Sequence, residues 1–255
     1  MPEISIAHLP DILKRNLEVD NEVKQLVKKY LEHYHLRGWN RIEGAIKWMQ
    51  DNHYLVIAPI EDSSLGGFIL YQSQKHICYI NSWHPRVYQN FILFHELYHV
   101  ISRKESYTEM EEVHVVESDM DSDYDERKAD YFASLLLLDE DKLISFYQSL
   151  KNNDFLYVIF YTMRHFGAPY KAVLIRMYEL NQISLDTLVE YFDLKFDFKK
   201  EFANLGFDPA PVQRSYTIDF SQIERVLDEN AFHLPEIATK SNRRTLEEVR
   251  EHFEQ

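Results

Sequence analysis

The stretch FHELYHV, from Phe94 to Val100, determines how the rest of the sequence is interpreted. It places His95 and His99 four residues apart, with Glu96 directly after the first histidine. Side chains four residues apart project from the same face of a helix, so both imidazoles can reach one metal ion at about 2.0–2.1 Å. Glu96 then lies beside the ion, where a carboxylate can accept a proton from a water molecule. The pattern predicts a zinc site with its own general base.

The alternative is a buried amphipathic helix that carries two histidines by chance. The predicted helix over 86–104 is rich in apolar and aromatic residues and is expected to be mostly buried. Two imidazoles and a carboxylate are costly to bury unless something satisfies them. A catalytic zinc ion requires three protein ligands and one open position, so a third ligand separates the two interpretations.

The stretch ERKADYFA, from Glu126 to Ala133, supplies that third ligand. Glu126 and Asp130 are four residues apart on the next predicted helix and share one of its faces. The arrangement makes Glu126 a zinc ligand and Asp130 the hydrogen-bond acceptor that orients a liganding imidazole. The small residues Ala129 and Ala133 permit a close approach of the two helices. We therefore expect one zinc ion per chain on two histidines and one glutamate.

Around these motifs the hydrophobic pattern predicts an α+β fold, with a small antiparallel sheet and a mainly helical remainder. The stretch HICYINSW is expected to be an edge strand that can align an extended substrate by β-addition. A helix beginning after a cap at Asp20 is expected before the sheet. The predicted strands are YLVIAPI (54–60), GGFILYQ (66–72) and HICYINSW (76–83).

We predict that the chain has three parts. Residues 1–20 form an N-terminal segment, residues 21–184 form one domain, and residues 185–255 form a C-terminal extension without an assigned role. A helix pair at about 153–181 has helix-turn-helix proportions, with Gly167 at the turn. Its second helix is mostly apolar, which favours packing over contact with DNA.

Composition excludes several classes of protein. The 28 basic and 42 acidic residues give a net charge of −14, which disfavours direct binding to nucleic acid. Cys78 is the single cysteine, so intrachain disulfides and a thiolate zinc cage are excluded. No apolar run approaches the roughly 20 residues that span a bilayer, and the first residues lack the pattern of a signal peptide. A cytoplasmic location is expected.

Acidic residues concentrate between the two metal motifs. Eleven carboxylates occur from Glu105 to Asp130, with little apolar periodicity. This segment is expected to be a solvated loop, and its charge would attract a basic protein partner.

His165 is a further candidate for the site. It stands near the end of a predicted helix, where its ring could hydrogen-bond the oxyanion of a tetrahedral intermediate. A partly exposed histidine at a helix C-terminus is the competing interpretation.

The motifs occur in an order that resembles the ImmA/IrrE family of cytoplasmic zinc metallopeptidases. CYIN, HELYH, ERKADYFA and LLLL follow one another, and RHFGAPYKAVLIRMYELNQIS is similar to a helix pair of that family. The resemblance covers about Asn21 to Ser184. It implies a zincin-like domain of the gluzincin type, with zinc on His95, His99 and Glu126 and with Glu96 as the base.

The resemblance also implies a function. Members of the family act on, or are encoded beside, helix-turn-helix repressors in stress, prophage or mobile-element circuits. A zinc-dependent endopeptidase that cleaves or inactivates a basic repressor is therefore expected. The alternative is a regulatory binding module that keeps the zinc site and sequesters its partner without cutting it. The chain departs from the family pattern at YQNF before the motif and at Leu138-Asp139 after the leucines. Neither departure removes a ligand.

Overall fold

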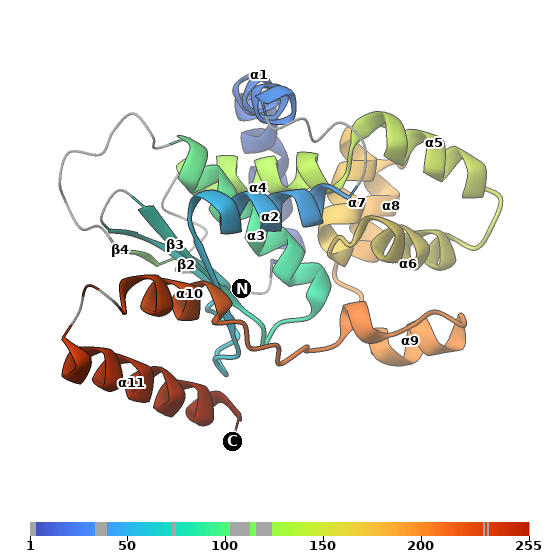
Figure 1. Ribbon diagram of the computed structural model, residues 1–255. Coiled ribbons are helices and arrows are strands. Elements are labelled where there is room, and N and C mark those ends of the chain that lie inside the picture. Colours follow the sequence, from blue (N-terminus) through green and yellow to red (C-terminus); the bar gives the residue numbers. More distant parts are fainter. Residues whose placement is uncertain are drawn as a thin grey trace.

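The chain folds as one four-stranded sheet that is flanked by helices, and most of the helices lie to one side of the sheet (Figure 1). In the computed structural model two central helices, α3 (Arg86–Ser102) and α4 (Tyr124–Leu137), carry the two sequence motifs and lie between the sheet and most of the other helices. The structure describes residues 4–33, 40–72, 75–102, 113–115, 124–231, 233 and 235–254.

The first long helix, α1 (Leu9–His33), begins well before the predicted boundary between residues 20 and 21. Its buried face starts at Leu9 and Ile12 and continues without interruption. Asp20 lies in the middle of the helix instead of capping it, and its carboxylate accepts a hydrogen bond from Tyr131 at 2.6 Å. The predicted N-terminal segment of 1–20 is therefore corrected, because one amphipathic helix runs through that boundary.

The sheet follows the strand order β1-β3-β2-β4. The α+β class is confirmed, but the sheet is mixed: β3 pairs antiparallel with β2 and parallel with β1. The stretch predicted as a substrate-binding edge is β3, which is paired on both sides, so that prediction is wrong. The strands are β1 (Tyr54–Ala58), β2 (Gly67–Gln72), β3 (Lys75–Asn81) and β4 (Val113–Val115).

Asn81 holds the loop between β1 and β2 at the end of β3. Its Oδ1 accepts a hydrogen bond from the amide of Ile60 at 2.8 Å, and its Nδ2 donates to the carbonyls of Ile60 and Leu65 at 2.8 and 2.9 Å. This one side chain holds both ends of the β1–β2 loop across the end of β3. Strand β1 lies on the far side of β3 from β2 and runs parallel to β3.

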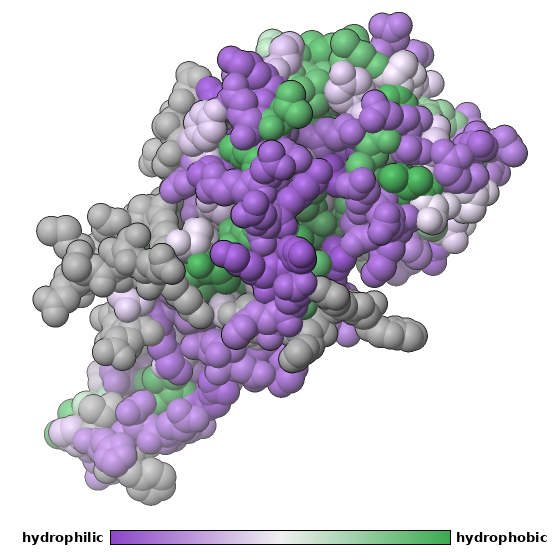
Figure 2. Space-filling model, turned by 90° about the horizontal axis from the view of Figure 1, so that it is seen from above, coloured by the Kyte–Doolittle hydropathy of each residue, from purple (hydrophilic) through white to green (hydrophobic). Residues whose placement is uncertain are grey.

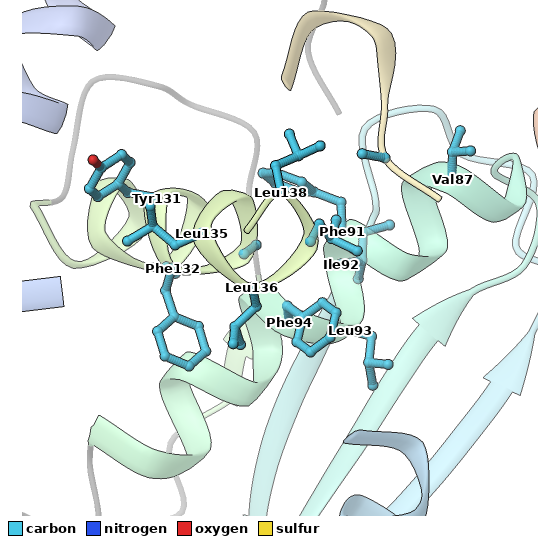
Figure 3. Packing of buried hydrophobic residues seen from close by; sticks show 14 of the residues in the cluster. Val87, Phe91, Ile92, Leu93, Phe94, Tyr131, Phe132, Leu135, Leu136 and Leu138 are labelled. Atoms are coloured by element: carbon cyan, nitrogen blue, oxygen red, sulfur yellow. The ribbon is translucent and has the colours of Figure 1, made fainter. Parts of the chain in front are cut away.

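The core lies where α3 (Arg86–Ser102) crosses α4 (Tyr124–Leu137) and packs on the sheet. Phe94 and Phe132 are fully buried, and apolar side chains from the two helices meet between them (Figure 3). Ala129 and Ala133 are also fully buried, as the close approach of the helices requires. Each large side chain buried here contributes about 1.5–3 kcal/mol, so the crossing of the two helices is strongly fixed.

The helical remainder continues the same core. The predicted helix pair is present as α6 and α7, and Gly167 ends α6 in the left-handed conformation at φ 63°. Helix α7 buries most of its length in this core. After the predicted boundary at 184, Leu188 and Phe192 still belong to this core. The helices of this part are α5 (Glu140–Leu150), α6 (Phe155–Phe166), α7 (Tyr170–Glu179), α8 (Leu185–Phe192) and α9 (Phe198–Asn204).

The last part of the chain covers a second face of the sheet. Helix α10 (Ser221–Asn230) packs on β1, and Phe220 forms a small apolar cluster with Val56, Ala58 and Tyr79. Helix α11 (Glu236–Glu254) follows and lies beside α10 (Figure 1). The predicted C-terminal extension is thus partly a structural layer of the same fold.

The surface seen from the side of α1 is mostly hydrophilic, with hydrophobic residues in separate spots (Figure 2). Among the described residues, no helix combines the length and the apolar character of a membrane span. Most of the predicted acidic loop, 103–112 and 116–123, lies outside the described residues, so its role stays a prediction.

Candidate metal centre

Helices α3 and α4 bring three candidate ligands to one point. The Nε2 atoms of His95 and His99 are 3.2 Å apart, and the carboxylate of Glu126 lies 3.1 Å from the first and 3.3 Å from the second. One ligand atom from each residue lies within 4.8 Å of the others, so the group could hold a metal ion. Both histidines are buried, whereas Glu126 is partly exposed and leaves a route to solvent.

The spacing of these atoms can be compared with a zinc shell. A tetrahedral shell with bonds of about 2.0–2.1 Å places neighbouring ligand atoms about 3.3–3.4 Å apart. The three distances of 3.1, 3.2 and 3.3 Å are within a few tenths of an ångström of that value. Two imidazoles and one carboxylate are also a donor set that zinc accepts in catalytic sites. The residues therefore fit such an ion.

Asp130 orients the first histidine. The Nδ1–H of His95 donates to Oδ1 of Asp130 at 2.9 Å, which directs Nε2 toward His99 and Glu126. Arg127, one turn earlier on α4, pairs through Nη2 with the other carboxylate oxygen of Asp130 at 3.1 Å. Arg127 was missed from the sequence, because its position three residues before Asp130 is also typical of an ordinary surface pair.

The pKa values of the cluster follow from these contacts. Burial would lower the pKa of His95, but its hydrogen bonds with Asp130 and Glu126 outweigh burial and raise the pKa to about 10. Burial would raise the pKa of Glu126, yet the two histidines hold it well below its usual range. The pKa of Asp130 is also lowered, because Arg127 and His95 outweigh its burial. The carboxylates therefore stay ionised, which is the form that binds a cation, whereas His95 carries a second proton that a metal ion would displace from Nε2.

Glu96 lies beside the group and against the sheet. Its side chain is 1% exposed. A Cβ placed on Gly67 of β2 would stand 3.1 Å from Oε1 of Glu96, 2.7 Å from Ile92 and 2.6 Å from a backbone oxygen. The glycine thus lets β2 approach the helix closely at the position of the predicted base.

A cavity of about 490 Å³ begins at Asp130 and extends along the first half of α3. Apart from Asp130, no residue that lines the cavity was predicted as part of a site. The lining comes from segments between residue 4 and residue 198 that are distant in the sequence and are brought together by folding. The aromatic side chains that line the cavity are those of Trp83, His84, Tyr88, Phe91, Tyr170, Phe196 and Phe198.

His165 does not join the group. Its ring stacks on Phe146 of α5 with a centroid distance of 4.3 Å, and it also contacts Phe166 edge-on. Burial and the positive charges of Arg164 and Lys142 lower its pKa. Among the described residues, no hydrogen bond or ring contact joins it to the candidate ligands, and the expectation of an oxyanion contact is not supported by this packing.

An α+β fold in which the helix with HELYH meets a second helix at two histidines and a glutamate is typical of metallopeptidases. Comparison with protein families agrees, since residues 51–178 match the IrrE N-terminal-like domain, Peptidase M78. The match covers half of the chain, and the protein therefore belongs to this metallopeptidase family. The resemblance to ImmA/IrrE peptidases is confirmed. A search of curated proteins gave no match.

Proposed function

We propose that the protein is a zinc-dependent endopeptidase whose substrate is a protein. The observation that carries the proposal is the convergence of His95, His99 and Glu126 within 4.8 Å, with buried Glu96 next to the first ligand. Three ligands leave one position for a water molecule or a peptide carbonyl, as a catalytic site needs and a structural site does not.

His95, His99 and Glu126 would hold the ion, and Asp130 would keep the imidazole of His95 in the liganding orientation. When bound, zinc would supply Lewis-acid polarisation of a carbonyl and would lower the pKa of a water molecule. The exposed side of Glu126 marks where a peptide would enter.

Glu96 would act as general base and then as general acid. Its carboxylate takes one proton from the attacking water, whose oxygen forms a bond to the carbonyl carbon of the peptide. The carbon–nitrogen bond then breaks, and Glu96 delivers the proton to the departing amine. Because Glu96 ends the cycle as it began, no further co-reactant is required.

The proposed partner is a basic helix-turn-helix repressor, and the proposed setting is the cytoplasm. The net charge of −14 favours encounter with a basic protein and disfavours direct binding to nucleic acid. The buried location of helix α7 also argues against DNA contact by the chain itself. A single buried cysteine fits a reducing compartment.

The direct test is incubation of repressors encoded beside this chain with the zinc-loaded protein and with its Glu96→Gln form. The expected result is a pair of repressor fragments that appears only with the wild type, while both forms bind the repressor. Mass spectrometry of the fragments gives the scissile bond. Glu190 on α8 is an exposed glutamate, so Glu190→Gln serves as the matched control and should cut normally.

A different result is that the wild type and Glu96→Gln bind the repressor equally tightly and produce no fragments. That result would contradict the endopeptidase and support the alternative, a non-cleaving binding module. Fragments that persist in Glu96→Gln would contradict the assignment of the base.

A further inference from the structure

The cavity beside the metal centre is lined mainly by rings and aliphatic side chains. Its volume of about 490 Å³ lies in the range of pockets that bind small ligands. Tyr88 and Phe91 line it and stand on the same face of α3 as His95, at spacings of three and four residues. The cavity therefore runs along the helix that carries the metal motif.

Asp130 connects the cavity to the metal centre. It lines the cavity and accepts the hydrogen bond of His95 at 2.9 Å, so only one side chain separates the cavity from a liganding imidazole. A substrate whose peptide bond lies at the metal centre would have the cavity within reach of a neighbouring side chain.

The charges around the cavity are largely paired. Arg127 pairs with Asp130 at 3.1 Å, and Lys171 pairs with Asp193 at 3.4 Å. These cations are already engaged, which disfavours a phosphate or carboxylate as the occupant. An uncharged aromatic ring instead gains apolar burial and edge-to-face contacts with the walls.

We propose that this cavity binds an aromatic side chain of the substrate next to the scissile bond, and so selects where the substrate is cut. The inference rests on the proposed peptidase function for its link to cleavage, but occupancy of the cavity can be measured without turnover.

The variants follow from the lining. Ala172 on α7 lines the cavity, so Ala172→Leu should fill part of it. Ala203 on α9 is exposed and lies outside the lining, so Ala203→Leu is the matched control. Phe196→Ala enlarges the cavity instead. Circular dichroism and zinc content identify any variant that fails to fold. If either Ala172→Leu or Phe196→Ala fails to fold, the other variant still tests the proposal.

The binding test titrates N-acetyl-phenylalanine amide and N-acetyl-alanine amide into Glu96→Gln protein, with saturation-transfer NMR as the readout. The phenylalanine ligand should bind about tenfold more tightly or better, and Ala172→Leu in the same background should remove most of this difference. Equal binding of the two ligands, or an aromatic preference unchanged by both cavity variants, would overturn the proposal.

The cleavage test uses a peptide mixture and records residues beside each cut. Aromatic residues should be enriched there. Ala172→Leu should lower kcat/KM for aromatic peptides about tenfold to a hundredfold, Phe196→Ala should favour tryptophan over phenylalanine, and Ala203→Leu should change neither. Cuts without aromatic enrichment would overturn the proposal. Cavity-dependent binding of the phenylalanine ligand without any cut would sustain the cavity and overturn the peptidase function.

Discussion

His95 and Asp130 are joined by a hydrogen bond of 2.9 Å that spans helices α3 and α4. This bond fixes which nitrogen of the imidazole points toward His99 and Glu126, and its acceptor also lines the aromatic cavity. Metal binding and substrate selection are therefore expected to depend on the same carboxylate.

Asp130→Asn should weaken zinc binding by about 10–100-fold without unfolding the protein, because loss of an orienting carboxylate typically costs that much. The measurement is competition for zinc with a chelator of known affinity. Asp186→Asn on α8 is an exposed control that should match the wild type. An unchanged affinity in Asp130→Asn would show that the imidazole is oriented by other contacts.

Arg127→Met should have a smaller effect in the same direction. The variant keeps most of the aliphatic volume but removes the guanidinium that pairs with Asp130 at 3.1 Å. Its neighbour Lys128 pairs with Glu22 on α1 at 2.8 Å, so Lys128→Met serves as the control. In the competition assay, the affinity for zinc should be highest for Lys128→Met, lower for Arg127→Met and lowest for Asp130→Asn. A reversed order of the last two would contradict the proposed relay of contacts.

Gly67→Ala should impair catalysis and lower stability by about 1–3 kcal/mol, as overpacking of a core does. The added methyl group would stand 2.6 Å from the carbonyl oxygen of Tyr79 and 3.1 Å from Glu96. At Gly66 the nearest atoms are 3.3 Å away and belong to the side chain of Ile92, so Gly66→Ala should be milder. Urea unfolding and zinc content measure the two variants. Equal stabilities would mean that β2 and α3 are not held as tightly as described.

Stability should fall in acid partly through Asp139. Burial would raise its pKa, but Arg41 and the amide of Lys142 hold the pKa below the ordinary value of 3.8. A folded-state pKa below the unfolded value means that the carboxylate stabilises the fold above about pH 4. This contribution disappears as the pH falls through the folded-state value.

Asp139→Asn keeps the helix cap of α5 but removes the charge opposite Arg41. At pH 7 it should lower the free energy of unfolding by about 1.5–3 kcal/mol, as expected for a hydrogen bond to a charged group. Its deficit relative to the wild type should shrink as the pH falls below about 4 and through the lowered folded-state pKa of Asp139. A deficit independent of pH in urea unfolding would contradict an ionic contribution.

The candidate metal ligands and Asp130 could be picked out from the sequence because each pair is local. His95 and His99, like Glu126 and Asp130, share a helix face at a spacing of four residues, and the structure brings the two faces together. The strand order could not be predicted, since it rests on pairing between separate strands and on contacts across the β1–β2 loop, such as those of Asn81.

The cavity and the place of His165 depend on contacts between distant segments. Phe196 and Trp83 line one cavity although more than a hundred residues separate them. His165 has the pattern of a helix-end histidine, and only its stack on Phe146 shows that it packs against α5. Such contacts leave no periodicity in the sequence.

Elemental analysis of the purified protein tests the central claim most directly. The account predicts about one zinc ion per chain in the wild type and in Glu96→Gln, and loss of most of that zinc in His95→Ala and Glu126→Ala, because an incomplete shell binds poorly. Full zinc occupancy in Glu126→Ala, or a wild-type protein that takes up no zinc after incubation with it, would contradict the metal centre.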